Sequence, residues 1–119
     1  MSEEPKFYSV AEIESVPEIT LGSADFVSRP IILMAKDEIT QFIDDKTPNR
    51  LVINFKNVHH ISSEFISALI GIQDHVRGND GELKLSHMNE TVLMPFKITN
   101  LADRLFKIYE TTPEAIDAF

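Results

Sequence analysis

The sequence predicts a single α/β domain with a mixed, mainly parallel sheet of four to five strands and about four helices. Its 119 residues suffice for one hydrophobic core but not for two. From residue 30 onward, helical and strand patterns alternate along the chain. A largely apolar run at Leu51–Phe55 is typical of a central strand covered on both faces. Together these features favour parallel strands joined by right-handed crossovers.

Residues 1–30 are the least regular part and are expected to add strands at the edge of the sheet. Phe7–Val10 and Glu18–Leu21 have the composition of short strands. Residues 22–25 have the composition of a turn. Pro30 is tolerated in a first helical turn, so the first helix is expected from there to about Asp44.

The middle of the chain is predicted to continue the alternation of helix and strand. Residues 46–50 break the first helix, and Leu51–Phe55 follows as a strand. Ser63 to about Arg77 has a wide apolar helical face, which ends at the glycine-containing turn 78–81. Residues 83–85 alternate apolar and polar side chains, which predicts a half-buried strand.

Two further helices and a last strand are predicted near the C-terminus. Asn89 is a candidate N-cap for the third helix, and Asn100 suits the left-handed conformation just after its end. Pro95 lies inside that helix and is expected to kink its first turn or to delay its regular part. Phe106–Tyr109 is expected as the last strand, before a short helix capped at residues 112–114.

Charge and composition exclude several classes of function. The formal net charge of -8 argues against nucleic acid and anionic membranes as partners, since both require a field of Lys and Arg. The chain has no cysteine, which excludes a disulfide framework and a thiolate metal site. No signal peptide and no membrane-spanning run are visible, so a cytoplasmic location and protein partners are expected.

The most specific chemistry follows the strand at Leu51–Phe55, where Ser62 and Ser63 precede an apolar helix. The first backbone N–H groups of a helix lack partners within it, and the helix dipole favours negative charge there. One interpretation is a helix N-cap, which contributes about 1 kcal/mol. The other is that Ser63 accepts a phosphate, although Glu64 beside it would repel that charge. The two interpretations are compatible.

Neither a metal site nor a catalytic site is expected. The candidate ligands have no recognised metal-binding spacing; they are His59, His60, Glu64, Asp74, His75 and His87. The sequence also lacks a nucleophile elbow, a phosphate-binding glycine loop and a catalytic triad pattern. We therefore predict a protein that is not an enzyme and that holds no cofactor.

The order of these features resembles a STAS domain, a family that includes bacterial anti-sigma factor antagonists and the cytoplasmic tails of sulphate transporters. The resemblance rests on the strand, the segment Asn57–Ser63, the apolar helix, the capped third helix and the segment Leu101–Phe106. It runs without gaps from about Leu51 to Phe119, and residues 1–119 are expected to form one STAS-like domain.

The junction of the family usually reads Ile-Asp-Ser-Ser/Thr-Gly-Leu-Gly, and residues 61–67 of this chain read Ile-Ser-Ser-Glu-Phe-Ile-Ser. In this register Ser63 falls on the serine that is phosphorylated in the antagonists. Glu64 replaces the second hydroxyl, and Phe65 and Ser67 replace the two glycines. Phe65 is therefore expected to block close approach of a partner's backbone or to offer it a bulkier contact.

The resemblance implies a switch that acts by binding proteins and controls transcription. The unphosphorylated domain would bind an anti-sigma factor with serine kinase activity, phosphorylation would weaken that binding, and a serine phosphatase would reset it. The expected docking surface consists of His60, Ser62, Ser63, Glu64 and Ser67. Two alternatives stay open: a STAS scaffold that is never phosphorylated, and a small metal-dependent enzyme. Without transmembrane helices, the chain is expected to be an antagonist rather than a transporter tail.

Overall fold

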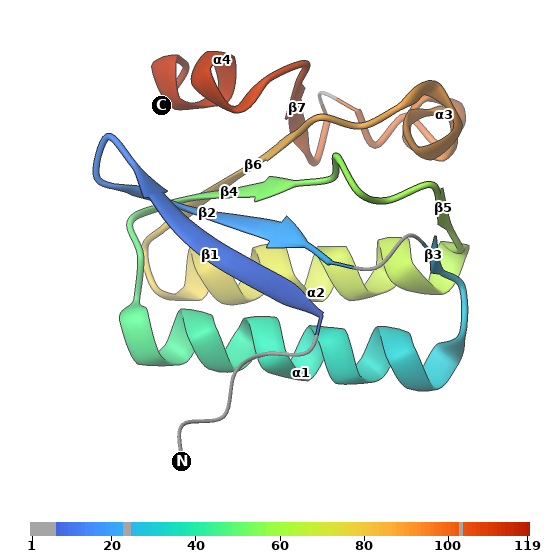
Figure 1. Ribbon diagram of the computed structural model, residues 1–119, viewed down its shortest axis with the longest axis horizontal. Coiled ribbons are helices and arrows are strands. Elements are labelled where there is room, and N and C mark those ends of the chain that lie inside the picture. The colour runs from blue at the N-terminus through green and yellow to red at the C-terminus, as the bar shows by residue number, and fades with distance from the viewer. Residues whose placement is uncertain (1–6, 23–24, 103) are drawn as a thin grey trace.

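A mixed five-stranded sheet forms the centre of the computed structural model, which describes residues 7–22, 25–102 and 104–119 (Figure 1). The strand order is β1-β2-β4-β6-β7, and only the β1–β2 pair is antiparallel. The bounds are β1 Tyr8–Ile13, β2 Val16–Leu21, β4 Arg50–Asn54, β6 Glu82–Ser86 and β7 Lys107–Tyr109. The prediction of a mixed, mainly parallel sheet is confirmed.

Four helices of the described residues cover the sheet, in agreement with the sequence. Figure 1 shows α1 (Arg29–Lys46) and α2 (Ser63–Gly78) side by side under one face of the sheet. On the opposite side lie α3 (Glu90–Ile98) and α4 (Thr112–Asp117) (Figure 1). Among the described residues, no helix is both long enough and apolar enough to cross a bilayer.

The alternation of side chains along β4 explains the layered arrangement. Leu51, Ile53 and Phe55 are fully buried in the large cluster that contains the buried side chains of α1 and α2. Val52 belongs instead to a smaller cluster with Ala115 of α4. Successive strand residues point to opposite faces, so a continuous apolar run lets both faces of β4 be covered.

A buried polar network fixes α4 on its face of the sheet. The Glu18 carboxylate on β2 accepts hydrogen bonds from Asn54 Nδ2 (3.1 Å) and from Thr112 Oγ1 (2.6 Å). Ser86 Oγ on β6 lies 2.8 Å from Thr112 Oγ1. All four side chains are buried, and a fully satisfied network of this kind specifies one position for the helix. Thr112 therefore anchors α4. The cap of this helix is Thr111, which accepts from the Glu114 N–H, and not Thr112 as the sequence predicted.

Two local expectations need correction. Asp25 belongs to a short strand, β3 (Asp25–Phe26), which pairs in parallel with β5 (His60–Ile61); residues 23 and 24 of the predicted turn lie outside the described part. Pro95 does not delay the third helix, since α3 begins before it. The Asn89 side chain accepts from the Val92 N–H at 2.8 Å and so starts the helix ahead of the proline. Asn100 has a φ of 60°, which confirms the predicted left-handed end.

Candidate functional site

The start of α2 is held in place by Ser62. Its side chain accepts a hydrogen bond from the Phe65 N–H (3.4 Å), which makes Ser62 the N-cap. Its own N–H donates to the carbonyl of Phe26 on β3 (3.1 Å). The cap therefore fixes α2 both internally and against a strand that lies far away in sequence. Of the two adjacent serines, Ser62 performs the structural role.

Ser63 is the first residue of α2 and is exposed. Its hydroxyl forms no hydrogen bond within the described part of the chain. Ser67 is exposed as well, one helical turn further along, so the two hydroxyls lie on the same side of α2. The described structure thus leaves Ser63 accessible to a visiting protein without any change of the cap.

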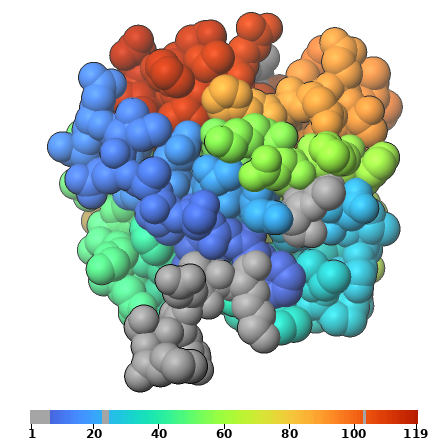
Figure 2. Space-filling model, in the orientation of Figure 1, coloured from blue at the N-terminus to red at the C-terminus, as the bar shows by residue number. Residues whose placement is uncertain are grey.

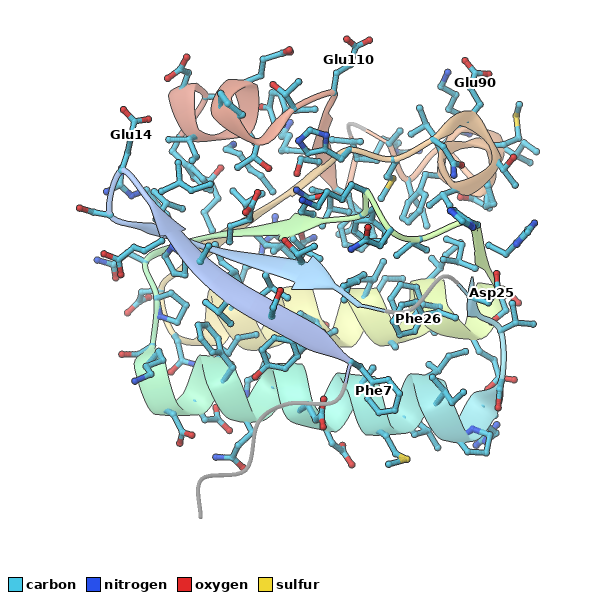
Figure 3. All side chains as sticks on the ribbon, in the orientation of Figure 1. Phe7, Glu14, Asp25, Phe26, Glu90 and Glu110 are labelled. Atoms are coloured by element: carbon cyan, nitrogen blue, oxygen red, sulfur yellow. The ribbon has the colours of Figure 1, made fainter. Side chains whose placement is uncertain are left out.

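Phe65 points inward, and the expectation that it contacts a partner is wrong. Its side chain is 1% exposed and stacks on Phe26, with ring centroids 4.6 Å apart and an interplanar angle of 23°. It also meets Phe55 edge to face at 6.3 Å. Burying the Phe65 ring against two other aromatic rings is more favourable in free energy than leaving it exposed to solvent. Figure 3 shows Phe26 directed into the interior above the first half of α2.

An ion pair and a contact between a histidine ring and a carboxylate connect the start of α2 and β5 to β3 and the start of α1. Arg29 Nη1 lies 3.3 Å from Glu64 Oε2, and His60 Nδ1 lies 2.8 Å from Asp25 Oδ1. The Arg29 and Glu64 side chains are 71% and 51% exposed, so solvent screens their attraction to about 1 kcal/mol or less. Their main effect is to place a cation beside Glu64, next to Ser63.

The sequence analysis missed Asp25 and Arg29 as members of this surface. Each lies 35 residues before its partner in the sequence, and the β3–β5 pairing brings the two segments together. One sequence signal was available for Arg29, which is the only Lys or Arg between residues 7 and 35. An isolated cation in an acidic chain is a reasonable candidate for a charged contact.

A shallow depression separates the first halves of α1 and α2. Its volume is about 170 Å³, and Arg29, Lys36, Glu64 and Ser67 are among the residues that line it. Small-molecule sites usually measure about 300–1,000 Å³. The depression therefore suits a side chain of a docking protein better than a free ligand.

Three of the four histidines have partners: His60 contacts Asp25, and His75 and His87 contact other groups. His75 Nε2 lies 2.6 Å from Asp44 Oδ1, and the Thr112 N–H donates to His87 Nε2 at 3.2 Å. The described residues contain no group of three or more side chains placed to hold a metal ion. His60 and Glu64 both belong to the predicted docking surface, but they contact different residues: His60 contacts Asp25, and Glu64 contacts Arg29.

The family model for the STAS domain matches residues 18–115 of this chain. The chain belongs to the STAS domain family. The match begins within β2 and ends within α4, and it includes α1, α2, α3 and all residues of the predicted docking surface. The resemblance seen in the sequence is therefore confirmed.

Solved structures support the same fold. An anti-sigma factor antagonist from Mycobacterium paratuberculosis has a TM-score of 0.80 and 19% identity, over 99% of this chain and 97% of that one. SpoIIAA in its unphosphorylated form has a TM-score of 0.73 and 17% identity, over 93% and 94%. The phosphorylated form of SpoIIAA from Bacillus has a TM-score of 0.65 and 18% identity, over 93% and 97%. At these identities the matches establish a shared fold.

Proposed function

We propose that this STAS domain is an anti-sigma factor antagonist of the bacterial cytoplasm, without enzymatic activity of its own. Its unphosphorylated form binds an anti-sigma factor with serine kinase activity, and phosphorylation of Ser63 weakens that binding. A serine phosphatase restores the binding form. The docking surface consists of His60, Ser62, Ser63, Glu64 and Ser67.

One observation carries the proposal: Ser63 is exposed at the first position of α2, while Ser62 alone caps the helix. A phosphate on Ser63 would therefore leave the cap and the core intact. The unpaired N–H groups of the first turn and the helix dipole would stabilise the dianion. The modification can then act on docking without unfolding the domain.

The electrostatics of the surface explain why a phosphate would oppose docking. It would add nearly two negative charges beside Glu64 in a chain whose net charge is already -8. Arg29, the cation that pairs with Glu64 at 3.3 Å, cannot neutralise both groups. A partner that covers this surface would have to desolvate the excess charge, which costs free energy unless the partner brings its own cation.

A STAS scaffold that is never phosphorylated is the second candidate function. The observation that favours it is the Arg29–Glu64 ion pair, because Glu64 already supplies a permanent negative charge next to Ser63. In this case Glu64 would take part in docking in the place of a phosphate.

Incubation with the cognate kinase and ATP, followed by intact mass measurement, separates the two functions. We expect the mass of one phosphate to be added to the wild type and to Ser67→Ala, and none to Ser63→Ala. An unchanged mass of the wild type, with binding to the anti-sigma factor retained, would favour the scaffold.

We further expect Ser63→Asp to weaken binding of the anti-sigma factor by about tenfold, because it adds one charge to the docking surface. The matched control is Ser9→Asp, which adds the same charge at an exposed position of β1. Titration calorimetry gives the affinities, and thermal unfolding should be similar for both variants. Equal affinities of Ser63→Asp and Ser9→Asp would show that residue 63 is not the switch.

A further inference from the structure

A cleft lies at the end of the molecule opposite to the start of α2. It measures about 500 Å³ and is formed by the β1–β2 hairpin, the last turn of α1 and the start of β4. Figure 3 shows the two ends of the molecule, with Glu14 at the tip of the hairpin and Asp25 near β5. The volume falls within the range of about 300–1,000 Å³ that is usual for small-molecule sites.

Two cations line the cleft. Lys46 ends α1 and Arg50 begins β4, and both are exposed. Neither side chain forms an ion pair or a hydrogen bond in the part of the chain that the structure describes. Glu12 is the one carboxylate of the lining, so the charged side chains of the cleft sum to a positive charge. This is unusual in a chain with 11 Lys and Arg against 19 Asp and Glu.

Part of the remaining lining of the cleft is apolar and held in place. Phe42 of α1 is half-buried and meets the Tyr8 ring edge to face, with centroids 6.2 Å apart. Pro48 is buried, and Pro17 lies on β2. Rings fixed in this way offer an apolar surface at little entropic cost. Cations beside such a wall suit a ligand with an anionic end and an apolar body.

The backbone around the cleft adopts conformations that are unfavourable for its residues. Glu14 and Ser15 form the tip of the hairpin with φ of 50° and 68°, and Thr47, the C-cap that follows α1, has a φ of 42°. Glycine or asparagine usually occupies such positions, and other residues cost on the order of 1 kcal/mol each. Such costs concentrate at sites that bind ligands. Glu14 projects away from the molecule, whereas Ser15 lines the cleft (Figure 3).

We propose that this cleft binds a small organic carboxylate with an aromatic or aliphatic body. The carboxylate lies between Lys46 and Arg50, and the body contacts Phe42 and the prolines. Ser15 and Asn49 provide hydrogen-bonding groups at the rim. This site does not depend on the proposed function of α2, because the β1–β2 hairpin and the start of α2 lie at opposite ends of the domain (Figures 1 and 2).

Titration of the 15N-labelled full chain with 1-naphthoate tests the proposal. We expect saturable shifts of backbone amide signals around the cleft, at Ala11, Asn49 and Arg50, and none at Ser63. The cation 1-naphthylmethylamine, of similar shape, should bind at least about tenfold more weakly, since it meets two like charges. Equal affinity for the two compounds, or shifts confined to other regions, would overturn the proposal.

A pair of double variants tests the role of charge. Lys46→Gln with Arg50→Gln should lower the affinity for 1-naphthoate by about tenfold. The control, Lys56→Gln with Arg77→Gln, changes the net charge equally at exposed positions outside the cleft and should leave the affinity unchanged. If the first double variant is unfolded, Arg50→Gln alone should lower the affinity at least threefold. Equal affinities for the test and control variants would overturn the proposal.

Discussion

Replacement of Phe65 by alanine tests the most informative departure from the usual family junction. The family has glycine at this position, so a surface role predicts that truncation is harmless. The structure instead buries the ring at 1% exposure between Phe26 and Phe55. The two views predict different changes in the free energy of unfolding.

The magnitude follows from three contributions. Loss of the buried side chain removes about 2 kcal/mol of transfer free energy. Loss of the stacked contact with Phe26, at 4.6 Å between centroids, removes about 0.5–1.5 kcal/mol. The cavity left in a close-packed core adds to this, so a total of about 3–5 kcal/mol is expected. Phe65→Ala should therefore consume a large fraction of the stability of a single domain, which is about 5–15 kcal/mol.

Urea unfolding followed by far-UV circular dichroism measures this free energy by linear extrapolation. The control is Ile98→Ala, which truncates a large apolar side chain that is 72% exposed on α3 and should change stability by about 0.5 kcal/mol or less. A loss below about 1 kcal/mol for Phe65→Ala, with an unchanged slope, would refute the core position of Phe65.

Three further predictions concern the cap, the polar network and a close contact. Ser62→Ala should lower the free energy of unfolding by about 1 kcal/mol, whereas Ser63→Ala should change it by about 0.5 kcal/mol or less. Equal effects of the two substitutions in urea unfolding would contradict the roles given to the two serines. Thr112→Val should cost about 1–3 kcal/mol and speed hydrogen exchange in α4, because it deletes the hydroxyl that joins the buried side chains. Gly81→Ala should cost about 1–3 kcal/mol, since a Cβ there would come within 2.5 Å of a backbone oxygen. Gly78→Ala is the control, because an added Cβ would meet no neighbouring atom within 4 Å, and it should be neutral or stabilising when both variants are compared by urea unfolding.

The regular elements were predictable because their patterns are local. The apolar run Leu51–Phe55 predicted β4, and the helical spacing after Ser63 predicted α2. Asn100 was predictable for the same reason, since its left-handed backbone follows from its own side chain. The two-residue strand β5 was not, because it has no periodicity and exists only through its pairing with β3.

The candidate site shows the same division. The position of Ser63 at the start of a helix followed from neighbouring residues, and the family register then suggested its role. The choice of Ser62 as the cap depended on backbone angles and on the hydrogen bond from its N–H to Phe26. No pattern in the sequence indicates which of the two adjacent hydroxyls caps the helix.

By itself, the sequence determined the class of fold, the order of the helices and strands, and the family of this protein, because periodicity and turn residues act over a few neighbours. Only the tertiary structure decided that Phe65 belongs to the core, that Arg29 meets Glu64, and that Lys46 and Arg50 line one cleft. Such contacts join segments distant in sequence, and their free energy depends on burial and geometry that exist only after the chain has folded.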